Sequence, residues 1–206
     1  GYGMCGRGLA ARMRGMGAHV TVTELDPLRA LEAAMDGFDV RPMEEAAGQG
    51  ELFITVTGNA EVLRKAHFLQ MRDGALIANS GHFNVEISIQ DLSELAADIR
   101  RQVRANVDEF VLEDGRRVYL LGEGRLINLA AAEGHPAGVM DMSFALQALT
   151  TEYAVRNRGG LAPKVHPVPR EIDQWVARLK LETMHIRIDR PTKRQSDYMA
   201  GWREGT

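Results

Sequence analysis

The glycine spacing at the start of the chain is the feature that most restricts its fold. The sequence begins GYGMCGRG, in which Gly1, Gly3 and Gly6 have the spacing G-x-G-x-x-G. Between a strand and a helix, this spacing permits a tight bend, lets the backbone approach a pyrophosphate, and lets the helix pack closely against the sheet. The helix N-terminus then offers N–H groups and a partial positive charge to the phosphates. Glycine clusters also form ordinary turns, so the spacing alone is weak evidence for a dinucleotide site.

The residues after the glycines strengthen this interpretation. Residues 4–14 are predicted to form a helix, and the run 19–23 is predicted to form a strand that ends at Glu24. A carboxylate about 20 residues after the glycines can accept hydrogen bonds from the ribose hydroxyls of adenosine. Because its charge would repel a 2′-phosphate, the pattern favours NAD over NADP. The alternative is a solvated charge at a strand end, and the upstream glycines make it the weaker interpretation.

Predicted strands and helices continue to alternate along the chain. Helices are expected at 27–35, at 43–47 and from Ala60, and strands at 39–41, 52–57 and 75–79. This order predicts an α/β fold with a Rossmann-type doubly wound parallel sheet. Ligands bind beyond the carboxyl ends of parallel strands. We therefore expect one site lined by three strand ends, at Glu24, at Thr57-Gly58-Asn59 and at Ser80-Gly81-His82.

The later part of the chain departs from this alternation. Residues 91–104 are predicted to form a charged amphipathic helix. Asp114-Gly115 predicts a hairpin, which would add antiparallel strands to the sheet. Further helices are expected at 140–156, 171–184 and 192–202, the last two after a linker rich in glycine and proline. The first of them carries an apolar stripe, interpreted as core or as a face for another helix, that consists of Met142, Leu146, Leu149 and Tyr153.

Composition excludes several classes of protein. The 206 residues are 45% hydrophobic and 26% charged, which is typical of soluble domains, and they allow one or two domains. A net charge of −3 gives no reason to expect nucleic acid or an anionic membrane surface as a partner. No apolar run reaches the ~18 residues of a membrane span. The single cysteine, Cys5, excludes an intrachain disulfide framework, fits a reducing compartment, and is interpreted as a small packed residue rather than a nucleophile.

Several longer stretches resemble one enzyme family. They are GYGMCGRG, VTELDPLRALEAAMDGF, TVTGN, NSGHFNVEI, DGRRVYLLGEGRLINLAAAEGHP and VPREIDQWVARLKLE. In order and spacing they resemble S-adenosyl-L-homocysteine hydrolase (adenosylhomocysteinase), over essentially the whole chain. In that family a split substrate domain surrounds a central NAD-binding Rossmann domain, and a C-terminal arm joins the subunits into a homotetramer. The resemblance implies that residues 1–134 are the NAD-binding domain, that 135–163 are a hinge and a return helix to the substrate domain, and that 164–206 are the oligomerisation arm.

The resemblance also implies a reaction, which is the reversible hydrolysis of S-adenosyl-L-homocysteine to adenosine and homocysteine. In the family, NAD oxidises the ribose 3′-hydroxyl, homocysteine is eliminated, water adds, and the stored hydride returns. A cytoplasmic location is expected. In the family, half of the substrate domain and the first Rossmann strand precede the glycine turn. We therefore expect a gap in the sheet and no hydrolysis by these residues alone, because the family's carboxylates, lysine and histidine for moving protons belong to the preceding part.

Site residues follow from the resemblance position by position. The implied catalytic residues are His82, which with Phe83 resembles a substrate gate, and His135 at the hinge. The implied cofactor-binding residues are Gly1, Gly3, Met4, Cys5, Gly6, Arg7, Gly8, Glu24, Arg29, Thr57, Gly58, Asn59, Ser80, Gly81, His82, Asn128 and His135, with no metal. Arg29 stands where some members have asparagine. Without the resemblance, His82 would be a hydrated loop histidine and His135 a hinge residue packed beside Pro136.

Two other functions and one choice of substrate stay open. One alternative is another NAD dehydrogenase with an inserted Rossmann domain. The second is a module that binds NAD or forms oligomers without catalysis. The tail YMAGWREGT lacks the lysine- and tyrosine-bearing extension that reaches a neighbour's NAD site in longer-tailed members, so capping across subunits is in doubt. The residues present do not separate adenosyl- from inosylhomocysteine, and the remaining histidines are interpreted as surface or packing residues, namely His19, His67, His166 and His185.

Overall fold

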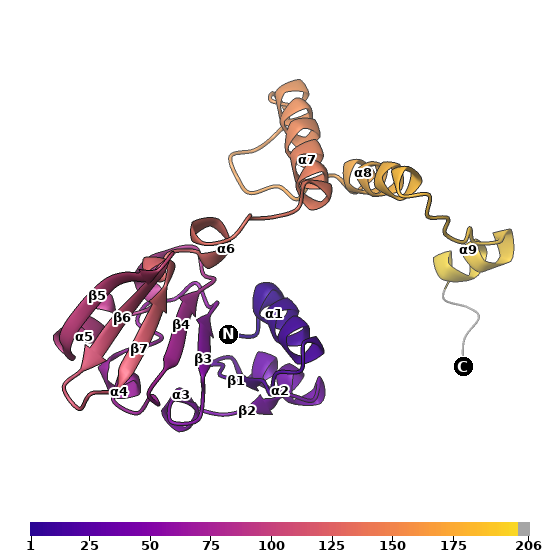
Figure 1. Cartoon of the computed structure of the whole chain (residues 1–206). Coiled ribbons are helices and arrows are strands. Elements are labelled where there is room, and N and C mark those ends of the chain that lie inside the picture. Colours follow the sequence, from indigo (N-terminus) through magenta and orange to yellow (C-terminus); the bar gives the residue numbers. More distant parts are fainter. Residues whose placement is uncertain (202–206) are drawn as a thin grey trace. The chain divides into compact units, whose positions relative to one another are not determined.

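The computed structural model describes residues 1–201, which form two compact units divided between Gly134 and His135. The first unit is an α/β domain and the second is helical (Figure 1). Each unit is described here by itself. Trp202, the last residue of the final predicted helix, lies outside the described residues.

The first unit begins with a small parallel sheet and two helices. In chain order these are α1 (Met4–Gly15), β1 (Thr21–Val22), α2 (Pro27–Met35) and β2 (Asp39–Val40). Helix α2 begins as predicted, because Pro27 occupies its first turn and the Asp26 side chain accepts a hydrogen bond from Leu28 N at 2.8 Å. These elements share a core made of Tyr2, Ala10, Val22, Ala33 and Phe38.

A five-stranded sheet forms the rest of the first unit. Its strands, in spatial order, are β3 (Leu52–Thr55), β4 (Ala75–Asn79), β7 (Arg117–Leu121), β6 (Val107–Leu112) and β5 (Ala96–Arg104). Short helices connect them, namely α3 (Met43–Ala46), α4 (Lys65–Phe68), α5 (Ile89–Glu94) and α6 (Ile127–Ala130), with 3₁₀ turns η1 (Asn84–Glu86) and η2 (Gly122–Gly124). Strands β3, β4 and β7 are parallel, whereas β6 is antiparallel to both of its neighbours. Among the described residues no ladder joins β1 to β3, so the two sheets are separate, as a gap in the sheet requires.

The predicted hairpin is confirmed. Strands β6 and β7 pair in register from Val107 opposite Leu121 to Val111 opposite Arg117. The turn between them has Gly115 at φ +86°, a backbone conformation that glycine adopts without strain. The antiparallel strands expected from Asp114-Gly115 are therefore present.

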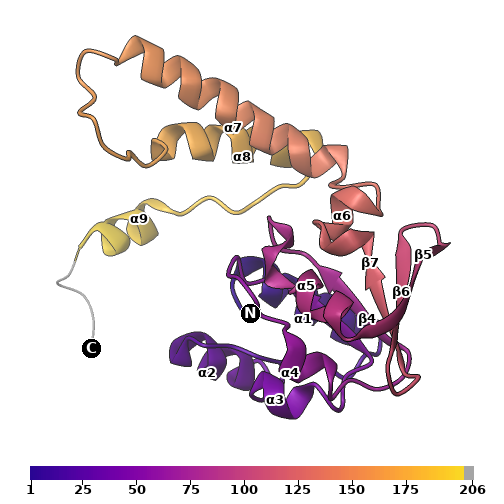
Figure 2. The same ribbon diagram turned by 90° about the vertical axis from the view of Figure 1, so that its left-hand side faces the viewer.

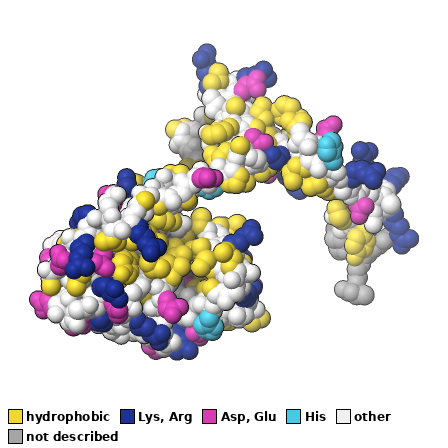
Figure 3. Space-filling view, in the orientation of Figure 1, with side chains coloured by type: hydrophobic (Ala, Val, Ile, Leu, Met, Phe, Trp, Pro, Cys, Tyr) yellow, Lys and Arg dark blue, Asp and Glu magenta, His cyan; other side chains and the backbone are white. Residues whose placement is uncertain are grey.

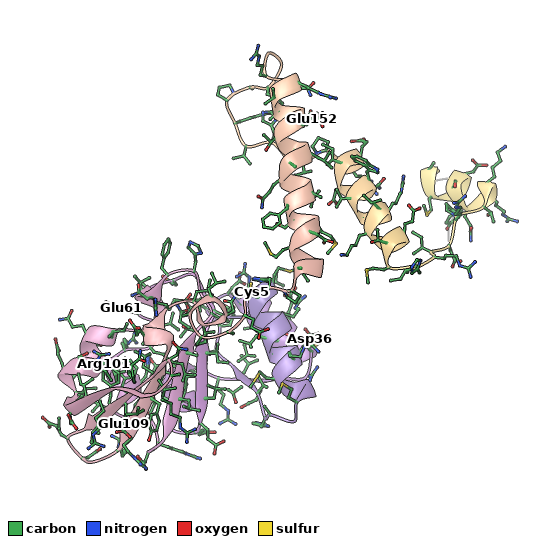
Figure 4. All side chains as sticks on the ribbon, turned by 45° about the horizontal axis from the view of Figure 1, so that its top comes forward. Cys5, Asp36, Glu61, Arg101, Glu109 and Glu152 are labelled. Atoms are coloured by element: carbon green, nitrogen blue, oxygen red, sulfur yellow. The ribbon has the colours of Figure 1, made fainter. Side chains whose placement is uncertain are left out.

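The helix predicted at 91–104 is wrong. Helix α5 ends at Glu94, and the remaining residues form β5, in which Ile99 lies opposite Phe110 of β6. Arg101 and Glu109 lie on these two strands (Figure 4). In this edge strand no side chain is fully buried and four of the nine residues are charged, so its sequence resembles that of a solvent-exposed helix. Pairing with β6 overrides that local preference.

The helix predicted from Ala60 is also wrong. Residues 60–64 are irregular, and α4 covers only Lys65–Phe68. Leu63 is fully buried and forms a parallel bridge with Ile87, and Glu61 has φ +52°, outside helical geometry. The chain here follows the segment after β4 rather than forming a crossover helix, because the bridge satisfies backbone groups that a helix would satisfy internally.

The second unit consists of α7 (Ala137–Arg156), α8 (Arg170–Thr183) and α9 (Lys193–Ala200). Helices α7 and α8 pack together (Figure 2). An ion pair joins Lys180 Nζ of α8 to Asp141 Oδ2 of α7 at 2.7 Å. The predicted apolar stripe of α7 is half-buried, and Phe144 and Trp175 are more than half exposed. In the described part of the chain, no helix combines the length and the hydropathy of a membrane span.

Candidate cofactor site

A pocket of about 310 Å³ lies where the carboxyl ends of β1, β3 and β4 meet the glycine turn. This volume is at the lower end of the range for small-molecule sites. Its lining residues are Gly1, Gly3, Met4, Cys5, Glu24, Arg29, Val56, Thr57, Gly58, Ser80, Gly81 and His82. Apolar side chains are exposed on the face of the first unit that carries β3, β4 and α1 (Figure 3). The three strand ends expected from the sequence are therefore brought together, and of the lining residues only Val56 was not predicted.

Two glycines make the turn tight enough to reach β3. A side-chain carbon on Gly6 would lie 2.1 Å from the Gly1 carbonyl oxygen, so any larger residue there would displace the turn. At Gly1 the same carbon would lie 3.0 Å from Thr57 Cγ2. At Gly3, by contrast, the nearest atom is Nη1 of Arg29 at 3.7 Å. The middle glycine therefore faces open space, where a ligand can approach the backbone.

Helix α1 directs its N-terminus at this pocket. Its first residues, Met4 and Cys5, line the pocket, and Gly3 supplies no side-chain cap. The first-turn N–H groups of a helix have no partner within the helix, and they carry the positive end of its dipole. An anionic group in the pocket can accept hydrogen bonds from them. Cys5 is exposed at this end of α1, so its interpretation as a small packed residue is wrong (Figure 4).

Glu24 is held in place by the backbone. Its carboxylate accepts hydrogen bonds from Tyr2 N at 2.6 Å, Leu25 N at 2.7 Å and Asp26 N at 3.1 Å. Burial raises the pKa of Glu24, but these three N–H groups outweigh it, so that the pKa lies below its ordinary value. A carboxylate offers about four acceptor sites, so one remains for a ligand hydroxyl. Arg29 also reaches the pocket, and its nearest carboxylate is that of Asp26, at 4.0 Å.

A buried carboxylate organises the loops after β3 and β4. Glu86, in η1, accepts hydrogen bonds from Thr57 N at 2.9 Å, Thr57 Oγ1 at 2.8 Å and Gly58 N at 2.7 Å. Buried Asn79, at the end of β4, accepts from Gly81 N at 2.7 Å and donates to the Gly124 carbonyl at 3.0 Å. Neither role was predicted from the sequence. One feature of the sequence could have indicated a buried role for Glu86. This carboxylate lies between the apolar residues Val85 and Ile87, in a segment that follows the end of a predicted strand.

Among the predicted catalytic residues, only His82 lines the pocket. Its side chain is exposed, and its ring lies edge-on to Phe83, with 4.4 Å between the ring centroids. His135 is the exposed first residue of the second unit, so the structure does not assign it to the pocket. Among residues 1–201 there is also no cluster of His, Cys, Asp or Glu suited to a metal ion.

The remaining predicted residues lie outside the lining of the pocket. They are Gly6, Arg7, Gly8, Asn59 and Asn128. Gly6 packs inside the turn, and Arg7 points to α2, where its guanidinium pairs with Glu32 at 2.6 Å. Gly8 and Asn59 are exposed, and Asn128 is half-buried on α6. Their contacts with a cofactor stay predictions, as do those of the lining residues.

Comparison with known proteins gives the family. Residues 1–134 match the family model described as the NAD binding domain of S-adenosyl-L-homocysteine hydrolase, which confirms NAD as the cofactor. The adenosylhomocysteinases of Aquifex aeolicus and Sulfurisphaera tokodaii are 61% and 59% identical over all 206 residues, which cover 49% of each relative. The chain thus spans about half the length of the curated relatives it matches. It belongs to the S-adenosyl-L-homocysteine hydrolase family.

Proposed function

We propose that this chain is the cofactor-binding part of an adenosylhomocysteinase, which reversibly hydrolyses S-adenosyl-L-homocysteine to adenosine and homocysteine. The observation that carries the proposal is the pocket in which the glycine turn, Glu24 and the loops after β3 and β4 meet. When bound there, NAD supplies the hydride acceptor and donor for oxidation and re-reduction of the ribose 3′-carbon. The chain's own residues hold and orient that cofactor.

Each part of the pocket has a distinct task in this proposal. The open side of Gly3 and the first turn of α1 bind the pyrophosphate. Glu24 accepts a hydrogen bond from the adenosine ribose and disfavours a 2′-phosphate, while Arg29 offers a positive charge beside them. Thr57, Gly58, Ser80 and Gly81 form the wall toward the nicotinamide end.

Other proposed roles rest on the family rather than on contacts in the pocket. His82 with Phe83 gates the entry of substrate, Asn128 reaches the nicotinamide, and His135 approaches the ribose from the hinge. Residues 135–163 return to the substrate domain, and residues 164–206 join subunits of a cytoplasmic homotetramer. The exposed apolar side chain of Phe144 on α7 supports packing against the substrate domain, and that of Trp175 on α8 supports the assembly role, because such surface is normally covered by a partner.

The sole cysteine of this chain provides a direct test of cofactor binding. Cys5 is exposed in the lining of the pocket, so bound NAD should cover it. In the full-length protein stripped of cofactor, we expect NAD to slow alkylation of Cys5 by iodoacetamide at least tenfold, as followed by peptide mass spectrometry. The same protein should release homocysteine from S-adenosyl-L-homocysteine only when NAD is present.

Adenosine alone is the matched control for the protection experiment, because it lacks the pyrophosphate that would lie beside Cys5. Equal alkylation rates with and without NAD would contradict the site. Protection without any homocysteine release would support the second candidate, a module that binds NAD without catalysis. That candidate is favoured for the isolated chain, since it spans about half of its enzymatic relatives.

A further inference from the structure

Glu86 is a buried carboxylate directly behind the wall of the cofactor pocket. We propose that Glu86 is a positioning residue of this site and that its negative charge favours the oxidised cofactor, NAD⁺, over NADH. The proposal rests on the proposed function, because it requires NAD to occupy the pocket. Four observations carry it, namely the burial of the side chain, its hydrogen bonds, the absence of an ion pair to it among residues 1–201, and its closeness to the lining residues.

The hydrogen bonds of Glu86 are those of an ionised carboxylate. Its side chain is 1% exposed. One oxygen accepts from Thr57 N at 2.9 Å and Thr57 Oγ1 at 2.8 Å, and the other accepts from Gly58 N at 2.7 Å. Hydrogen bonds from fixed N–H and O–H groups to a charged acceptor are strong, and they compensate for part of the lost hydration. They also fix the loop that follows β3.

Glu86 differs from the other buried carboxylates of the described chain in forming no ion pair. Asp108 pairs with Arg101 at 2.6 Å, and Glu109 pairs with Arg100 at 2.9 Å. No lysine, arginine or histidine among residues 1–201 forms an ion pair with Glu86. Its charge is spread by hydrogen bonds and forms no ion pair among these residues, although it acts electrostatically on the Gly1 ammonium. The negative charge of Glu86 would therefore attract a cation bound in the adjacent pocket.

Glu86 lies close to the pocket because only the backbone of two loops separates it from the pocket. A side-chain carbon on Gly81 would lie 1.6 Å from Glu86 Oε1, so only glycine allows the loop after β4 to lie on this carboxylate. Thr57, Gly58 and Gly81 all line the pocket, and all three contact Glu86. One layer of backbone thus separates the carboxylate from the pocket. Glu86 sets the spacing between the loops that follow β3 and β4.

The negative charge of Glu86 would affect NAD⁺ and NADH differently, whereas its positioning of the loops would affect both cofactors alike. NAD⁺ and NADH share the adenosine and the pyrophosphate, but only NAD⁺ carries a positive charge on its nicotinamide ring. A negative charge several ångströms away in a partly dry site therefore stabilises NAD⁺ selectively. For a screened pair of this kind we expect a preference of about three- to tenfold.

The test compares two variants of the full-length protein that remove different properties of the same contact. Glu86→Gln removes the charge and keeps the shape. Thr57→Val keeps the charge and removes the two hydrogen bonds of the Thr57 hydroxyl, which donates to Glu86 and accepts from Asn59 N. Dissociation constants for NAD⁺ and NADH are measured by titration calorimetry for each protein. We expect Glu86→Gln to lower the ratio of the NADH constant to the NAD⁺ constant by about three- to tenfold. Thr57→Val should weaken both cofactors similarly and leave this ratio within about twofold.

An unchanged ratio in Glu86→Gln would overturn the role of the charge, even if both cofactors bound more weakly. Should Glu86→Gln not fold, Glu86→Asp decides, because it keeps the charge on a shorter side chain. We expect that variant to lose affinity for both cofactors and to retain the preference for NAD⁺, and equal affinities would overturn the proposal. Failure of the unmodified protein to bind either cofactor would instead refute the proposed function.

Discussion

Replacing Glu24 should change both the affinity for NAD and the discrimination against NADP. Three of the roughly four acceptor sites of this carboxylate are occupied by backbone N–H groups of Tyr2, Leu25 and Asp26. One site is then left for a ribose hydroxyl. A hydrogen bond to a charged group contributes about 1.5–3 kcal/mol, which corresponds to roughly 10- to 150-fold in the dissociation constant.

Glu24→Gln keeps the length of the side chain and removes the charge, and it should therefore weaken NAD binding by about tenfold or more. NADP should lose little affinity or none, since the repulsion of its 2′-phosphate disappears together with the hydrogen bond. The preference for NAD over NADP should narrow by on the order of tenfold, or about 1.4 kcal/mol. Glu24→Ser should narrow it similarly and should also release the three N–H groups that the carboxylate holds.

The measurement is titration calorimetry of NAD and NADP with the full-length protein. Glu32→Gln is the matched control, because Glu32 is a carboxylate of the same unit that pairs with Arg7 and does not line the pocket. It should leave both affinities within about twofold. Equal affinities of the unmodified protein for NAD and NADP, or an unchanged affinity of Glu24→Gln for NAD, would refute this assignment.

Two further predictions concern histidines. His82→Ala should lower the turnover of the full-length enzyme while its folded oligomeric state stays unchanged; normal turnover with unchanged substrate affinity would leave His82 an ordinary loop residue. Burial, together with the nearby Arg64, lowers the pKa of His67, and Glu44 opposes this only in part. His67 therefore binds a proton more readily in the unfolded chain than in the folded one. As the pH drops below ~6.5, the free energy of unfolding should fall by up to about 1.4 kcal/mol per pH unit. His67→Gln should reduce this slope in urea unfolding at pH 7.5 and 5.5, whereas the exposed His19→Gln should not; equal slopes in all three proteins would contradict the prediction.

Signals that act within a few residues were readable from the sequence. The glycine spacing, the proline that begins α2 and the Asp114-Gly115 turn each restrict backbone angles locally, so the elements beside them could be predicted. Because β3 and β4 are parallel, their carboxyl ends lie at the same edge of the sheet, and the residues that follow both strands line one pocket. Glu24 follows β1, in the separate small sheet, and its position at the site could be predicted from its spacing after the glycines.

Tertiary structure alone decided the features that depend on distant partners. The residues of β5 are a strand because β6 offers them a ladder, although their charged periodicity suits a helix. The position of Glu86 between the apolar residues Val85 and Ile87 shows only that it could be buried, since its donors Thr57 and Gly58 are 29 and 28 positions away in the sequence. Burial of a carboxylate is tolerated only where folding brings such donors together. Its role in the site could therefore be recognised only in the folded chain.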